Sequence, residues 1–163
     1  MVTSNQIGLT LFGVAGNPPL NTGASFAALT FLQLKKTQLL PAFGVTHANI
    51  DVSDLGTGFT SAVKGAATGN DTTFTFHGDG LDAGMVSALL AAAGQDGLFS
   101  LKIVRGTGAD TGDGPAPVSG DVVEYAQGYL HSFVPNPKDD SSFEGGTISF
   151  KQNAPTIKAT QPA

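Results

Sequence analysis

The sequence predicts a mainly β protein, an antiparallel β-sandwich or β-barrel with one short flanking α-helix at about residues 81–94. Short runs of alternating apolar and polar residues recur along the chain, and this is the period of a half-buried strand. Twenty-two glycines and nine prolines supply many turns. At 163 residues we expect one domain, 1–163, with a leading segment at 1–24 and a C-terminal tail at 153–163.

The expected strands differ in how their apolar residues are arranged. Phe74 and Phe76 alternate with threonine, and Ile148 and Phe150 alternate in the same way near the C-terminus, so each pair indicates one buried face. The run at 26–35 is apolar on both faces, so we expect a strand covered by protein on each side. In chain order the expected strands are 8–12, 26–35, 45–51, 72–76, 98–105, 122–134 and 146–152.

One segment has helical spacing. Asp82 is a good N-cap, Met85 and Leu89 recur on one helical face, and Gly94 supplies a C-terminal stop. We expect that face to pack on the sheet. Glycine-rich composition predicts loops at 13–24, 53–70 and 106–120, and "NPKDDSS" predicts a hairpin turn at 136–142.

Charge and composition limit the functional classes. Thirteen acids against eight bases give a formal net charge of −5, which argues against a protein that grips nucleic acid. Only 13% of the residues are charged, as expected for subunits that pack on copies of themselves. The chain has no cysteine, so neither disulfides nor thiolate metal sites are available. The first residues lack a basic leader and no run is long enough for a membrane span, so we expect neither signal peptide nor membrane contact.

A histidine and two aspartates lie close together in "HGDGLD". His77, Asp79 and Asp82 could belong to a metal site or an acid/base pair, but the other histidines, His47 and His131, are isolated in the sequence. A corner between a strand and a helix explains the same residues, so no metal ligand is expected.

The sequence contains no recognisable catalytic motif. Asp110 and Asp113 lie among glycines as in a calcium loop, but no repeat supplies the other oxygens that calcium needs. Ser87 and Ser132 lack an acid–histidine neighbourhood and the Gly-x-Ser-x-Gly turn of serine hydrolases. We expect no enzyme, no catalytic residue and no cofactor.

Three segments, read in order, resemble a known family. They are "VTHANIDVSDLGTGFTSAVKGA", "NDTTFTFHGDGLDAGMVSALLAAAGQDGLFSLKIV" and "YAQGYLHSFVPNPKDDSSFEGGTISFKQNAPTI". Their order and short consensus fragments resemble the major tail proteins, or tail tube proteins, of long-tailed bacteriophages over residues 43–157. The insertion at 106–120 and the leading segment depart from that family, which leaves the contacts between rings open.

The resemblance implies a structural virion protein. Such subunits have a β-sandwich or β-barrel with one flanking helix, and they form hexameric rings that stack into a hollow tail tube. The partners implied are copies of the chain itself and other tail proteins (tape measure, tail terminator, baseplate or tip). Genome DNA would pass through the lumen without specific binding during delivery to the host. The implied location is the tail of the virion, assembled in the host cytoplasm.

The resemblance also directs the choice of site residues. We expect the 53–70 loop to contact an adjacent ring through Phe59 and Val63, and the tail at 153–163 to order against a neighbour. An acidic lumen would repel phosphates. The lumen-lining candidates are Asp51, Asp71 and Asp79, with Asp139, Asp140 and Glu144 as second choices.

The alternative is a β-sandwich virion-surface or adhesion module that binds a receptor or glycan through its loops. Such a module favours exposed aromatic side chains. The chain has no tryptophan and two tyrosines, both within 122–134, which weighs against glycan stacking.

Overall fold

The computed structural model describes residues 8–77, 96–142 and 144–163. Across these residues the chain is mainly β, with antiparallel pairing and one short helix, so the predicted fold class is confirmed. The helix expected at 81–94, with Asp82, Met85 and Leu89, lies outside the described residues, and so does Asp79. The described elements are β1 Leu9–Ala15, α1 Gly23–Ala27, β2 Leu32–Leu34, β3 Thr37–Leu39, β4 Val45–Asp54, β5 Phe59–Gly69, β6 Asp71–His77, β7 Leu98–Arg105, β8 Val122–Pro135, β9 Gly145–Gln152 and β10 Ile157–Thr160.

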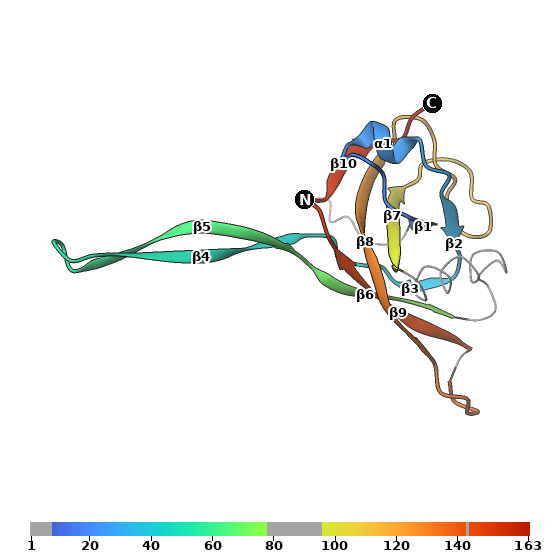
Figure 1. The fold of residues 1–163 in the computed structure, drawn as a ribbon. Helices are drawn as coiled ribbons and strands as arrows, with labels where there is room; N and C mark the ends of the chain where they lie inside the picture. Colours follow the sequence, from blue (N-terminus) through green and yellow to red (C-terminus); the bar gives the residue numbers. More distant parts are fainter. Residues whose placement is uncertain (1–7, 78–95, 143) are drawn as a thin grey trace, which may run out of the picture.

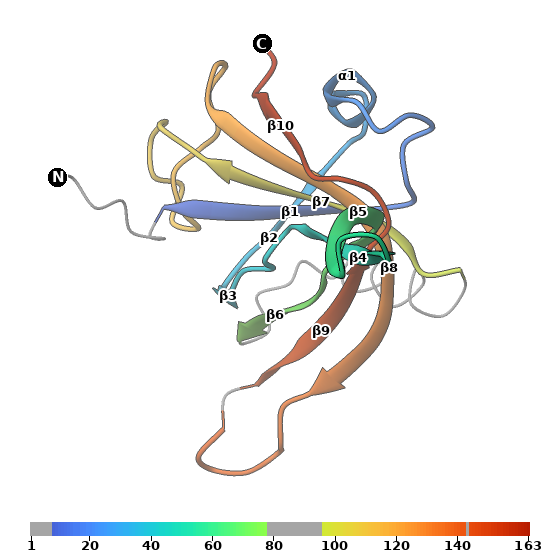
Figure 2. The ribbon, with the colours of Figure 1, turned by 90° about the vertical axis from the view of Figure 1, so that its left-hand side faces the viewer.

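Eight of the strands form one curved sheet, in the order β2-β1-β7-β8-β9-β6-β3, with β10 paired to β8 (Figure 1). The long strand β8 organises this sheet. Its N-terminal end pairs with β10 and its C-terminal end pairs with β9, while β7 lies along its other edge. Figure 2 shows β8 curving as it passes from β7 and β10 toward β9.

The two ends of the sheet are joined by the chain itself. β2 and β3 stand at opposite ends of the strand order, yet only Lys35 and Lys36 separate them in the sequence. Lys36 adopts a left-handed φ of 53°, which makes this tight turn possible. Because the chain connects these edges without a ladder of hydrogen bonds, the barrel is not closed.

The main core lies on the inner face of the curved sheet. The alternation predicted for Phe74, Phe76, Ile148 and Phe150 is confirmed, because all four side chains are buried in this cluster. The other buried members come from β1, β2, β7 and β8: Leu11, Leu34, Phe99, Leu101, Ile103, Ala126 and Leu130.

The outer face of β7 and β8 carries a second core, and here the prediction of a strand at 26–35 is wrong. Thr22 caps α1 by accepting a hydrogen bond from the Ser25 N–H at 3.3 Å. Fully buried Phe26 then stacks on Tyr125, with ring centroids 4.9 Å apart. The apolar run therefore covers the sheet from one side as a helix and linker, and only Leu32–Leu34 within it forms a strand.

β7 is consequently buried on both faces. Ser100 and Lys102 alternate with Phe99, Leu101 and Ile103 along the strand, and both polar side chains are buried as well. The Lys102 ammonium lies 4.7 Å from the centre of the Phe12 ring and 5.2 Å from that of Phe31. Burial lowers the pKa of Lys102, while these cation–π contacts and a 3.3 Å hydrogen bond to Gln161 offset part of the desolvation.

The remaining connections follow the prediction unevenly. The 106–120 segment is a connection as expected, with one isolated bridge between Asp110 and Pro115, and the turn at 136–142 joins β8 to β9. The prediction of a loop at 53–70 is wrong, because β5 occupies most of this segment. The tail expected to need a neighbour instead forms β10 on the chain's own β8.

Candidate assembly surface

The most distinctive surface of the molecule is a two-stranded arm. β4 and β5 pair with each other and with no other described strand, and Figure 1 shows them projecting away from the body. The ten residues of β4 correspond to a length of about 33 Å at the usual rise of an antiparallel strand. Every residue from 46 to 64 is exposed. A hairpin of this kind is marginally stable alone in water, so a partner surface would stabilise it.

One face of the arm is apolar. The register pairs Ile50 with Val63, Val52 with Ser61 and Asp54 with Phe59, and the members of these pairs share a face because side chains alternate along a strand. Ile50, Val52, Phe59 and Val63 are between 49% and 73% exposed. Four large apolar side chains facing water on one ribbon are typical of a binding surface.

The opposite face of the arm is polar and nearly neutral. The register pairs Asn49 with Lys64, Asp51 with Ala62 and Ser53 with Thr60. Asp51 and Lys64 are diagonal neighbours on this face, so the acid has a base close to it. The arm is therefore amphipathic, with each face defined by the strand period.

The tip of the arm, residues 54–59, is a hydrogen-bonded turn. The Asp54 carboxylate accepts from the Gly56 N–H at 2.8 Å, and the Asp54 carbonyl accepts from the Gly58 N–H at 2.9 Å. The hydrogen bonds from the Gly56 N–H and then from the Thr57 hydroxyl lower the pKa of Asp54. Gly58 has φ 66°, a conformation that glycine adopts without strain. Leu55, at 98% exposed, extends into solvent from this ordered turn.

The base of the arm is fixed to the body by buried Gln152 at the end of β9. Its side-chain oxygen accepts from the Gly44 N–H at 3.0 Å, and its backbone N–H donates to the Asn70 carbonyl at 3.0 Å. Its side-chain nitrogen donates to Ala154 and Thr156. A Cβ on Gly69 would collide with the Gln152 backbone, so β5 can join the body at this point only with a glycine. The direction of the arm is thereby held by the sheet.

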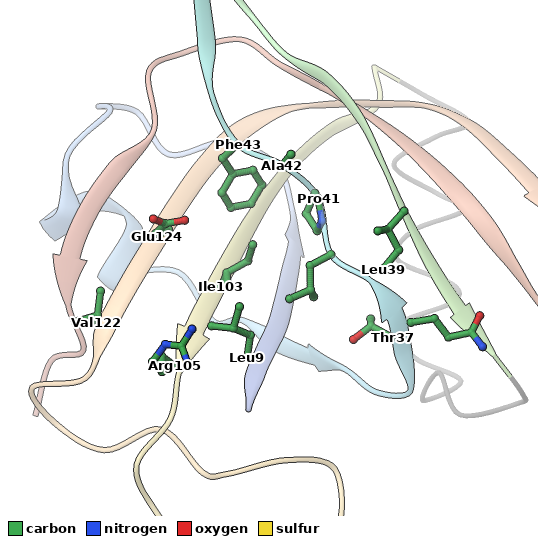
Figure 3. Close-up of a pocket in the computed structure, with 12 residues that line it drawn as sticks. Leu9, Thr37, Leu39, Pro41, Ala42, Phe43, Ile103, Arg105, Val122 and Glu124 are labelled. Atoms are coloured by element: carbon green, nitrogen blue, oxygen red, sulfur yellow. The ribbon is translucent and has the colours of Figure 1, made fainter. Parts of the chain in front are cut away.

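Beside the arm's base is a pocket of about 650 Å³. Figure 3 shows it between β3, which carries Leu39, and the start of β8, which carries Val122. Ile103 lies between these two strands and Phe43 lies on the segment that leads into β4. The pocket lies at the edge of the main core, because Leu9, Leu40 and Phe43 line it and also pack against that core. The charged lining residues are Arg105 and Glu124, and Glu124 pairs with Lys158 at 3.5 Å.

The structure places the expected contact residues on the arm. Phe59 and Val63 both lie on its apolar face, although they belong to a strand instead of a loop. Ile50, Val52 and Leu55 are also exposed on the arm and were not predicted as contact residues. The signal for the first two was present, because Ile50 and Val52 are two positions apart and Phe59 and Val63 are four apart, and an even separation places each pair on one face of a strand.

The lumen candidates are dispersed. Asp51 lies on the polar face of the arm. Asp71 lies on β6, and its carboxylate is 2.8 Å from His131 Nε2. Asp79 lies outside the described residues. The second choices, Asp139, Asp140 and Glu144, are exposed in the connection between β8 and β9.

Within the described parts of the chain, no group of three or more histidine, aspartate or glutamate side chains could hold a metal ion. Nor does the described structure contain a helix long and apolar enough to cross a membrane.

Comparison with solved structures identifies the architecture. A chain in the anti-feeding prophage baseplate superposes with a TM-score of 0.64 at 6% identity, over 100% of this chain and 99% of that one. The SPP1 tail tube gives a TM-score of 0.58 at 13% identity, over 96% of this chain and 78% of that one. The chain has a tail-tube fold. A third match, at 0.55 and 8% identity over 91% and 92% of the two chains, comes from a sheath/tube terminator of the PVC extracellular contractile injection system.

The tail-tube fold is shared across these structures at low sequence identity. No protein-family model matches the sequence, and no curated protein matches it. The baseplate, tube and terminator structures are parts of phage tails or contractile injection systems, and at such low identity the likeness defines the fold alone.

Proposed function

We propose that this protein is a structural subunit of a phage-type tail tube, which polymerises into stacked hexameric rings around a channel for genome DNA. The observation that carries the proposal is the arm, an ordered amphipathic hairpin whose apolar face has no covering partner within the described chain. The tail-tube fold of the body supports the same function, and the six-fold symmetry of the similar baseplate structure supports the ring.

Within this proposal the apolar face of the arm forms the contact between rings. Burial of Ile50, Val52, Phe59 and Val63 against an adjacent ring would remove apolar surface from water and supply the free energy of assembly. Ring formation would also bring the subunit together with the other tail proteins that begin and end the tube. The virion tail is then the working location, after assembly in the host cytoplasm.

Electron microscopy of the purified protein tests the assembly. We expect rings or tubes by negative stain, at concentrations where mass action favours association. A protein that remains monomeric at high concentration would favour the alternative of a virion-surface or adhesion module.

A shortened arm tests which element drives assembly. Residues 50–63 are removed and Asn49 is joined to Lys64 through an Asn-Gly turn, because these two residues are partners in the register. We expect a folded monomer that forms no tubes, since β4 and β5 contribute no strand to the main sheet. The matched control changes Leu20→Ser, an exposed apolar residue off the arm, and should assemble normally. Tubes from the shortened protein would contradict the role of the arm.

A further inference from the structure

The proposed assembly leaves open which surface of the neighbour receives the arm. Several large apolar side chains are exposed in the subunit, and two groups of them lie on the arm and on the rim of the pocket. One is on the arm, with Leu55 at 98% and Phe59 at 73% exposed near its tip. The other is on the rim of the pocket in Figure 3, where Leu39 is 51% and Val122 is 60% exposed.

We propose that this pocket, between β3 and the start of β8, receives the arm tip (residues 54–59) of a second copy of the chain. Leu55 and Phe59 of the tip enter the apolar interior over Ile103, and Leu39 and Val122 close around them. The inference rests on the proposed function, and it assigns the receiving site within that assembly.

The chain's own arm cannot fill the pocket. Ala42 and Phe43 line the pocket immediately before β4 begins at Val45, so the pocket lies at the base of the arm. The tip lies about 33 Å away along an extended β4, and the ribbon projects away from the body (Figure 1). An occupant that has the shape of this tip must therefore come from another copy.

Size and charge fit the same occupant. A cavity of about 650 Å³ is in the range of sites that enclose compact ligands, which is enough for two large apolar side chains. The rim carries the Arg105 guanidinium and the Glu124 carboxylate, and Glu124 is paired with Lys158 at 3.5 Å, so the Asp54 carboxylate at the tip would approach the Arg105 side of the rim. The ordered turn at the tip lowers the entropy lost on docking, because Asp54 and Gly58 already hold its shape.

The geometry also determines the type of assembly. The tip and the pocket are different surfaces of one subunit, so each copy can give its arm to one neighbour and receive an arm from another. Such a heterologous contact continues from subunit to subunit and does not end at a dimer.

Thiol cross-linking tests the contact directly, because the chain has no native cysteine to interfere. Two single-cysteine variants, Leu55→Cys and Val122→Cys, are made at exposed positions where folding should be unaffected. They carry tags of different mass, are mixed under assembly conditions and are treated with a short bis-maleimide. We expect a cross-linked heterodimer containing one copy of each variant. The control replaces Val122→Cys with Leu20→Cys, which is 64% exposed but outside the pocket, and should give at least tenfold less product.

Charged substitutions supply an independent measurement. Leu55→Asp and Val122→Asp should each abolish tube formation, but in an equimolar mixture the two variants should associate and their tags should co-purify, because the intact tip of the Val122→Asp variant then meets the intact pocket of the Leu55→Asp variant. Tubes that form while Leu55→Cys and Val122→Cys give no heterodimer would overturn the docking site and leave the tail-tube function standing. Absence of both tubes and cross-links in every variant and in the unmodified protein would overturn both proposals.

Discussion

Asp121 shows how a single buried carboxylate fixes a long connection. It is 7% exposed and accepts hydrogen bonds from the Thr107 hydroxyl at 2.7 Å, the Val118 N–H at 2.7 Å and the Thr107 N–H at 3.1 Å. The first two bonds are the main cause of a pKa lowered from the ordinary 3.8. Because Thr107 and Val118 stand near opposite ends of the 106–120 segment, one side chain closes it.

The stability that Asp121 contributes should depend on pH. A folded-state pKa below 3.8 means that the contribution is complete above pH 3.8 and is lost as the pH falls through the lower folded-state value. Asp121→Asn should therefore reduce the melting temperature at pH 7, and the difference from the unchanged protein should shrink at acid pH. Asp140→Asn, at an exposed aspartate of the β8–β9 turn, serves as the control and should change little. A deficit of equal size at every pH would show that charge is not the cause.

At the scale of elements, the arm depends on the sheet for its direction. Gln152 ends β9 and bonds to Gly44, which precedes β4, while its backbone bonds to Asn70, which follows β5. A register shift near the base, between His47 and Asn49, bends the ribbon at a β-bulge. The arm is thus a rigid extension of the sheet at its base and an amphipathic ribbon beyond it.

Loss of the Gln152 side chain should loosen the arm. Gln152→Leu keeps the volume but removes the acceptor of the half-buried Gly44 N–H, which should destabilise the fold by about 1 kcal/mol. Limited trypsin digestion should cleave faster after Lys64, the one lysine of the arm. The matched change Gln38→Leu, at an exposed glutamine, should leave both measurements unaltered. Unchanged cleavage together with lower stability would contradict a role for Gln152 in holding the arm.

At the scale of the whole molecule, the excess of acidic over basic residues would affect function only in the proposed tube, where it would act on passing DNA. A net charge of −5 is spread over acids on separate elements, so the lumen charge depends on which of them face the channel. Only lumen-facing groups would act on DNA, because salt at about 0.1 M screens charges beyond about 10 Å. Asp51 and Asp71 remain our candidates among the described residues.

Charge reversal in assembled tubes tests these candidates. Tubes that carry Asp51→Lys and Asp71→Lys should retain labelled duplex DNA at low salt and release it at high salt, because lysines bind phosphates by displacing counterions. Unmodified tubes should retain none at either salt. The control, Asp110→Lys, reverses one charge in the 106–120 connection and should retain no DNA. If tubes with Asp51→Lys and Asp71→Lys release as much DNA at low salt as unmodified tubes do, Asp51 and Asp71 have no role in the lumen.

The sequence by itself determined the features that local physics controls. Alternation identified the buried faces of β6 and β9 through Phe74, Phe76, Ile148 and Phe150, because the strand period is a property of neighbouring residues. The polar hairpin turn at 136–142 was equally local. The order of the strands, together with short fragments, was enough to suggest the tail-tube fold. It also led to the prediction that Phe59 and Val63 are contact residues, and both lie exposed on the arm.

Only the tertiary structure decided which segments find partners. Residues 53–70 are rich in glycine, threonine and alanine, so they become a strand only through pairing with β4. The run at 26–35 became helix and linker because β7 and β8 offered an outer face for Phe26. Lys102 is buried beside the rings of Phe12 and Phe31, which are distant from each other in sequence. The pocket joins residues from four separate segments of the chain. Such contacts depend on the whole path of the chain, whereas periodicity and turn chemistry depend on residues a few positions apart.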